Sequence, residues 1–250
     1  MLSNKLSLNN INNTLSNLKD NIINIKEQEA KQINPTEYIL SIDGARANMI
    51  NWISFLCTKL NFSDQTLFRC VTIFDQYFSK ISPKEVLNLD QQNLNLITIG
   101  CLSLSTKLEE INCNYISFLN EKVLNSQNSK IFINKDLTKM ELKILKTLKF
   151  KTLYSTPLDF LEIYIEIFRN IFVKGDLMMD SQTFSNIKTF SINLMKNNIT
   201  NKMYLTNISS DFANICLIKA LEQLNMMNSF QYKQLEKSIL TLNYQFANVL

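Results

Sequence analysis

The sequence predicts an all-α protein, with an N-terminal helix followed by two tandem helical repeats. Apolar residues recur at helical spacing along most of the chain, and polar turn signals separate these stretches. The 250 residues contain only three Gly and three Pro. That scarcity favours long helices and rules out the Gly-rich loops that cradle phosphates in nucleotide-binding folds. The two halves of the chain are similar in size and in helical pattern.

The first predicted helix covers residues 13–32. Leu15, Leu18, Ile22 and Ile25 form one apolar stripe on an otherwise polar helix, and the Asn-Pro pair at 34–35 ends it. We assign residues 1–39 to an N-terminal tip and this helix. A single stripe of this kind packs either on the rest of the chain or on a partner.

Five helices are predicted in the first repeat, residues 40–152: 44–61, 63–78, 90–110, 114–124 and 134–149. Ser63 and Asp90 are suitable N-caps, and a polar loop covers 125–130. The third helix is apolar or small nearly all round, which is typical of a helix surrounded by others. Gly100 in its middle predicts close approach of a neighbouring helix.

The second repeat, residues 153–250, begins with a clear helix-start signal. Thr156 is placed to cap, Pro157 occupies the first helical position, and Asp159 adds an acid to the first turn. Four helices are predicted near 157–173, 181–197, 207–225 and 229–248.

Composition excludes several classes of function. With no His, the chain has no Ser-His-Asp or Cys-His site, and its five Cys form no C-x-x-C pair. No carboxylate pair or metal cluster has a usable spacing, so we expect a non-enzyme with no cofactor and no metal. The net charge of +4 is too mild to indicate nucleic acid or a membrane. Reduced thiols and the absence of signal or membrane-spanning segments predict the nucleus or the cytoplasm rather than secretion.

Five segments, in this order and close to this spacing, resemble the cyclin box: Ala45–Ile53, Thr66–Ser79, Leu94–Glu110, Met140–Leu148 and Thr156–Leu161. The resemblance covers about residues 44–162 and implies two five-helix cyclin-fold repeats. It also implies a non-catalytic subunit that binds and activates a Ser/Thr cyclin-dependent protein kinase, in cell-cycle control. Activity would then belong to the kinase.

The resemblance assigns roles to particular residues. Arg46 and Asp75 match a buried ion pair that ties the first helix of the repeat to the second. Lys107 and Glu141 match two residues that lie close together in cyclins and hydrogen-bond the kinase backbone near its mobile helix. The positions of apolar kinase contacts are held by Leu108, Leu145 and Phe150.

The resemblance is weakest at the patch where some cyclins dock R-x-L peptides of substrates or inhibitors. Residues at or beside this patch are Ala45, Asn48, Met49, Trp52, Phe55 and Asn95. Asn48 stands at an apolar position, and Phe55 replaces an acid. We therefore predict poor R-x-L recruitment.

The main alternative is a cyclin-fold adaptor that never activates a kinase, either transcription-factor-like or a scaffold. The Lys-rich stretch at 139–151 is its best support, but such runs are usually solvated faces. The chain has only three Arg, the residue most often used to read DNA bases, so it is poorly equipped for base-specific recognition of DNA.

Overall fold

The computed structural model describes residues 20–32, 43–111, 134–174 and 181–224. These residues form helices and short connections, with no strand among them, so the predicted all-α class is confirmed. None of the helices in these ranges is both long and apolar enough to cross a membrane. The helices predicted at 114–124 and 229–248, and the 125–130 loop, lie outside the described residues.

The chain divides into two compact units. One comprises residues 32–156 with 198–206, and the other comprises 1–31, 157–197 and 207–250. The predicted boundaries are 39/40 and 152/153; in this division, residues 1–31 group with the second repeat, and the segment 198–206 groups with the first repeat. Its contact with Arg46, described below, gives the physical reason.

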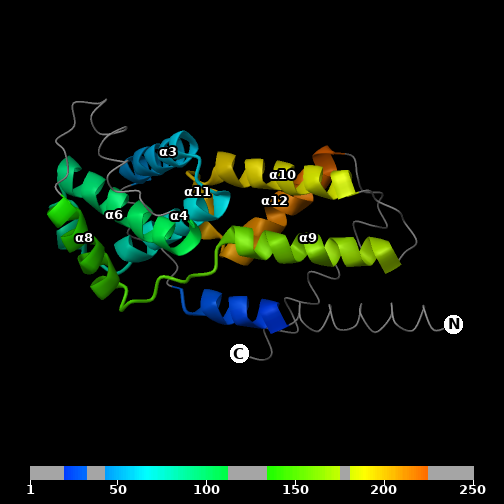
Figure 1. Cartoon of the computed structure of the whole chain (residues 1–250), viewed down its shortest axis with the longest axis horizontal. Helices are drawn as coiled ribbons and strands as arrows, with labels where there is room; N and C mark the ends of the chain where they lie inside the picture. Colours follow the sequence, from blue (N-terminus) through cyan, green and yellow to red (C-terminus); the bar gives the residue numbers. More distant parts are fainter. Residues whose placement is uncertain (1–19, 33–42, 112–133, 175–180, 225–250) are drawn as a thin grey trace. The chain divides into compact units, whose positions relative to one another are not determined.

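The helices described in the first unit are α3 (Asp43–Leu60), α4 (Asp64–Phe78), α5 (Pro83–Leu87), α6 (Gln91–Glu109), α8 (Asn134–Thr147) and α11 (Lys202–Thr206) (Figure 1). Helix α6 contacts α3, α4 and α8, so the predicted central position of the third long helix is confirmed. A Cβ placed on Gly100 would lie 2.9 Å from Ile144 Cδ1 and 3.2 Å from Met140 Cγ. Gly100 therefore lets α8 approach α6 closely, as predicted.

Capping residues define where these helices begin. Ser63 accepts a hydrogen bond from the backbone N–H of Thr66, and Asp90 accepts one from that of Asn93, which confirms both predicted N-caps. Helix α5 was not predicted, because the Ser-Pro sequence there indicates only a turn. Ser82 and Glu85 form a reciprocal capping box that starts this short helix.

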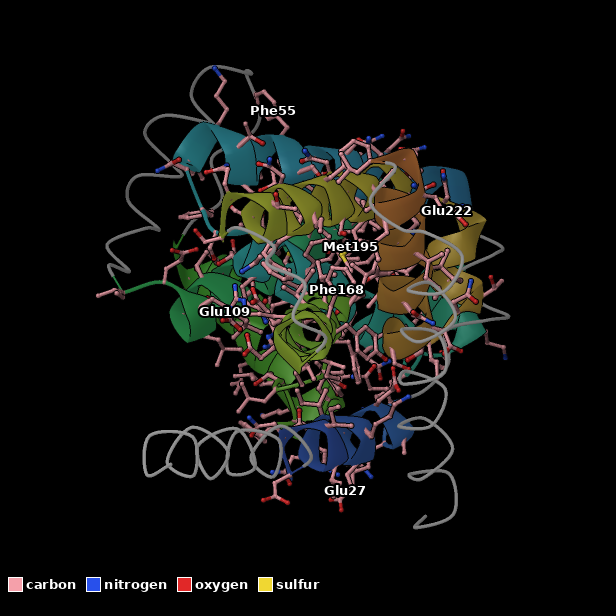
Figure 2. The ribbon with its side chains drawn as sticks, turned by 90° about the vertical axis from the view of Figure 1, so that its right-hand side faces the viewer. Glu27, Phe55, Glu109, Phe168, Met195 and Glu222 are labelled. Carbon is pink, nitrogen blue, oxygen red and sulfur yellow. The ribbon has the colours of Figure 1, made fainter. Side chains whose placement is uncertain are left out.

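In the second unit, residues 20–30 are helical and are followed along the chain by α9 (Pro157–Lys174), α10 (Ser181–Asn198) and α12 (Ser209–Gln223). Helices α9 and α12 pack together. Phe168 of α9 and Met195 of α10 are fully buried, whereas Glu27 of the first helix is exposed (Figure 2). The helix predicted at 207–225 begins at Ser209 in the structure, after the separate short helix α11.

Glu29 caps α12 from a distant part of the chain. Ile208 occupies the N-cap position and provides no side-chain hydrogen bond. Instead, the Glu29 carboxylate accepts hydrogen bonds from the backbone N–H (2.7 Å) and the hydroxyl (2.9 Å) of Ser210. Lys26 Nζ lies 3.2 Å from the same carboxylate and also donates to the Ser210 hydroxyl. The N-terminal helix is thus anchored to its own unit by charge and by hydrogen bonds.

Candidate functional site

Lys107 and Glu141, the two predicted polar contacts, form an ion pair between α6 and α8. Glu141 Oε1 accepts hydrogen bonds from Lys107 Nζ (2.6 Å) and from Ser103 Oγ (2.5 Å). The Glu141 side chain is 10% exposed and that of Lys107 is 45% exposed. Packing against α6 holds the carboxylate, while the ammonium reaches the surface.

This pair retains hydrogen-bonding capacity. Both hydrogen bonds to Glu141 use the same oxygen, and within the described part of the chain Oε2 accepts none. Lys107 uses one of its three N–H donors in the described contacts. A donor on the exposed ammonium of Lys107 and an acceptor on the mostly buried carboxylate of Glu141 are therefore held side by side by the ion pair.

Large apolar side chains are exposed in the same two segments. Leu108 is 41% exposed, Phe150 is 64% exposed, and Leu145 is half-buried. Among the described residues, seven large apolar side chains are strongly exposed, and five of them fall within residues 108–111 and 142–153. These five are Leu108, Ile111, Leu142, Phe150 and Leu153. Ile111, Leu142 and Leu153 were not predicted as site residues. Contiguous apolar patches mark interaction sites in general, and these five side chains are the candidates for such a patch here.

The backbone after α8 fixes the direction in which the chain leaves this helix. Lys149 (φ 52°) and Phe150 (φ 59°) both adopt left-handed conformations, which non-Gly residues rarely adopt. The Phe150 N–H donates to the carbonyl of Leu145 at 2.7 Å, which closes the end of the helix. Strained backbone of this kind persists only where surrounding contacts hold it.

Arg46 and Asp75 lie together in the interior of the first unit. Arg46 Nε donates to Asp75 Oδ1 and Nη2 donates to Oδ2, both at 2.8 Å. Arg46 is 0% exposed and Asp75 is 4% exposed, so the bidentate pair joins α3 to α4 away from water.

Two further contacts of Arg46 were not predicted. Its Nη1 donates to the carbonyl of Ile199 at 3.3 Å, and its guanidinium lies 5.5 Å from the ring centroid of Tyr204. Burial and the nearby carboxylate of Asp75 raise the pKa of the Tyr204 phenol, which is hydrogen-bonded to Thr72. Arg46 therefore anchors the segment 198–206 to the first repeat, a contact that spans 153 residues of sequence.

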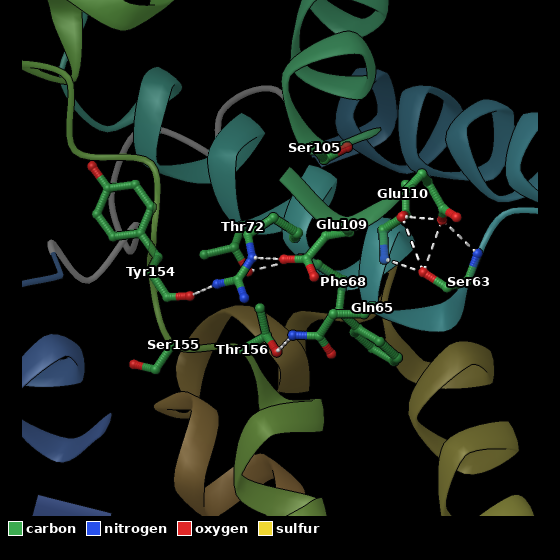
Figure 3. Close-up of polar contacts among 12 residues, drawn as sticks. Ser63, Gln65, Phe68, Thr72, Ser105, Glu109, Glu110, Tyr154, Ser155 and Thr156 are labelled. Atoms are coloured by element: carbon green, nitrogen blue, oxygen red, sulfur yellow. Dashed lines mark hydrogen bonds and ion pairs between the residues drawn. The ribbon is translucent and has the colours of Figure 1, made fainter. Parts of the chain in front are cut away.

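Two consecutive glutamates fix the end of α6 beyond Lys107 (Figure 3). Glu109 accepts a hydrogen bond from Arg69 Nε at 2.7 Å, and Arg69 also donates to the carbonyl of Tyr154. The Glu110 carboxylate accepts hydrogen bonds from the backbone N–H of Ser63 (2.8 Å) and from the hydroxyls of Ser63 and Thr66.

Burial alone would raise the pKa of Glu110, but the hydrogen bonds from Thr66 and Ser63 outweigh it, so this pKa lies below its usual range. The network of Arg69, Glu109 and Glu110 ties α6 to α4 and to the connector after α8. It thereby positions both segments of the exposed apolar surface. Two features of the sequence pointed to this network: the adjacent acids after Lys107, and the position of Arg69 among apolar neighbours on α4.

The residues of the predicted docking patch lie on α3 and at the start of α6. Asn48 and Phe55 are exposed, and Phe55 lies at the outer edge of α3 (Figure 2). The half-buried members are Ala45, Trp52 and Asn95. Met49 is only 7% exposed, so it belongs to the core more than to an accessible patch.

A family model for the N-terminal domain of cyclins matches residues 20–153, more than half of the chain. The chain belongs to the cyclin family. Its similarity to individual relatives is moderate. It is 28% identical to cyclin-D2-2 of Oryza sativa over 123 residues, and 31% identical to G2/mitotic-specific cyclin-3 of Saccharomyces cerevisiae over 116 residues.

These two alignments cover 49% and 46% of this chain, and 33% and 25% of the respective relatives. The chain thus aligns with no more than a third of either relative's length.

Solved structures show the same fold at low identity. A viral cyclin from herpesvirus saimiri superposes with a TM-score of 0.68 at 16% identity, covering 92% of this chain and 97% of the viral one. A chain of the yeast RNA polymerase II CTD kinase CTDK-1 complex gives a TM-score of 0.55 at 18% identity, covering 82% of this chain and 62% of that one. These matches support a cyclin fold for the chain.

Proposed function

We propose that this cyclin binds and activates a Ser/Thr cyclin-dependent protein kinase as its non-catalytic subunit, in cell-cycle control. The observation that carries the proposal is the Lys107–Glu141 ion pair, set between two segments rich in exposed apolar side chains. Membership of the cyclin family supports it. We place this activity in the nucleus or the cytoplasm.

Each part of this surface has a role in the proposed contact. Lys107 donates to a backbone carbonyl of the kinase, and Glu141 Oε2 accepts from a backbone N–H. The existing ion pair orients both groups in advance, which reduces the entropy lost on binding. Leu108, Leu145 and Phe150 supply apolar anchors, whose removal from water on binding favours association.

The cyclin acts on the kinase by holding its mobile helix inward. In protein kinases this helix carries the Glu that pairs with the catalytic Lys, and the pair must form together with the metal site. A rigid surface is needed for this task. The hydrogen bonds of Glu109 and Glu110 at the end of α6, and the close α6–α8 contact at Gly100, supply that rigidity.

Substrate selection through R-x-L peptides is expected to be poor. Met49 is buried and Phe55 stands where an acid would attract a basic peptide. We propose that substrates or inhibitors reach the complex by other contacts.

A kinase-independent adaptor, either transcription-factor-like or a scaffold, is the second candidate. One observation favours it: within the described residues, Lys139 is the one lysine of the 139–151 run that pairs with a carboxylate, that of Asp136. A basic face would suit phosphate contacts. Recovery of transcription or scaffold components in place of a kinase would support this candidate.

The binding step is tested by affinity purification of the tagged chain from its own cells, with bound Ser/Thr kinase measured by activity and by mass spectrometry. We expect Lys107→Ala/Glu141→Ala to lose the kinase while its melting temperature stays within a few degrees. The matched control is Lys188→Ala/Glu162→Ala, which removes a partly exposed ion pair of the same 2.6 Å length elsewhere. Kinase retained by the first variant, or lost equally from both, contradicts the assigned surface.

A further inference from the structure

Three lysines gather where α4 ends and where the chain leaves α8. Lys80 follows α4, and its ammonium donates to the Tyr154 hydroxyl at 3.3 Å and lies 5.9 Å from that ring's centroid. Lys149 and Lys151 are exposed and precede Tyr154 by five and three residues. Because extended chain advances about 3.3 Å per residue, Lys151 lies within roughly 10 Å of Tyr154. We call Lys80, Lys149 and Lys151 the lysine cluster.

The three ammonium groups repel one another. Burial, followed by the charges of Lys151 and Lys149, lowers the pKa of Lys80. None of the three forms an ion pair within the described part of the chain. Glu85 of α5 accepts hydrogen bonds from its own N-cap Ser82, which lower the pKa of its carboxyl, and the lysine that adds to this effect is Lys143. The lysine cluster therefore carries positive charge that no carboxylate among the described residues neutralises through an ion pair.

Helix dipoles balance only part of this charge. Lys80 lies just beyond the C-terminus of α4, and Lys149 lies just beyond that of α8. Each helix C-terminus is equivalent to about half a negative charge, so two ends offset about one of the three positive charges. A charge of about +2 is left for a ligand.

We propose that the lysine cluster binds a phosphorylated segment of a partner protein. A phosphate monoester carries about −1.5 to −2 charges and three acceptor oxygens, which matches the residual charge and provides one acceptor for each ammonium. Tyr154 holds Lys80 in place, and the left-handed backbone at Lys149 fixes the direction of the connector in which Lys151 lies. Duplex DNA fits less well, since it needs a longer basic track along successive phosphates and the whole chain has three Arg. The proposal does not depend on kinase binding.

The probe is a short fluorescein-labelled Gly/Ser peptide with two phosphoserines, compared with the same peptide unphosphorylated and with a labelled DNA duplex. Anisotropy reports binding to the full chain at moderate salt, because screening weakens such contacts at high salt. We expect Lys80→Gln/Lys149→Gln/Lys151→Gln to weaken binding of the phosphopeptide by at least about tenfold. Lys80→Arg, which keeps the charge, retains binding, and this separates charge from folding.

A second triple variant removes the same net charge from exposed lysines elsewhere: Lys59→Gln, Lys135→Gln and Lys219→Gln. We expect it to bind the phosphopeptide within about twofold of the unaltered chain. Equal loss in both triple variants, equal binding of the unphosphorylated peptide, or tighter binding of the duplex through the same three lysines would overturn the proposal.

Discussion

Replacing Arg46 with Met tests whether the buried ion pair holds the first unit together. Met keeps most of the length of the side chain but removes the guanidinium. Asp75, 4% exposed, then loses two hydrogen bonds of 2.8 Å and its counter-charge, and the carbonyl of Ile199 loses a donor. Breaking a buried pair from one side costs about 3–5 kcal/mol. For a chain of this size, each kcal/mol lowers the melting temperature by about 2–4 °C, so we expect a fall of roughly 6–20 °C.

The assay is unfolding by heat and by urea, with Arg169→Met as the control. Arg169 forms an i,i+3 pair with Glu166 and its side chain is 47% exposed, so its loss should cost about 0.5 kcal/mol or less. The double variant Arg46→Met/Asp75→Leu removes both charges and should be more stable than either single variant. The reasoning is refuted if Arg46→Met unfolds at no lower temperature than Arg169→Met. It is also refuted if the double variant is destabilised by the sum of the losses in the Arg46→Met and Asp75→Leu single variants.

Three further predictions concern other parts of the fold. Glu29→Ala should destabilise the second unit by about 1–2 kcal/mol in urea unfolding because α12 loses its cap, whereas Glu27→Ala, on the exposed face, should change little; equal effects would contradict the capping role. Gly100→Val should cost about 1–3 kcal/mol or more, because its Cβ would lie 2.9 Å from Ile144 Cδ1, and an unchanged urea midpoint would rule out the close α6–α8 approach. Burial raises the pKa of the Cys216 thiol from 9.0 to about 12. Between pH 9 and pH 12 the thiol therefore loses its proton in the unfolded state but keeps it in the folded state. The free energy of unfolding should fall as the pH rises from about 9 to 12. In circular dichroism melts across this range, Cys216→Ala should reduce the slope, and an unchanged slope would exclude the thiol as a cause.

Local signals in the sequence were enough to place most helix starts. Ser63 and Asp90 cap α4 and α6 through contacts within three residues, so neighbouring residue types reveal them. Gly100 indicated a close helix contact because a glycine within an apolar helix has few other uses. The short helix α5 was missed because Ser-Pro was interpreted only as a turn, although Glu85 completes a capping box there.

Long-range contacts could not be predicted in this way. Glu29 and Ser210 are 181 residues apart, and Arg46 and Ile199 are 153 apart, so no local pattern links them. At the site, the pairing of Lys107 with Glu141 was anticipated through the resemblance to cyclins. The exposure of Leu142 and Leu153 was not, because apolar residues on helices and connectors are usually assigned to the core.

The measurement that tests the central claim most directly is the activity of the recovered kinase, purified, with and without the purified chain. We expect a large increase in phosphoryl transfer with the chain, and none with Lys107→Ala/Glu141→Ala at equal concentration. The control Lys188→Ala/Glu162→Ala should activate fully. A kinase that binds the chain with unchanged activity would contradict activation and leave the adaptor as the better account.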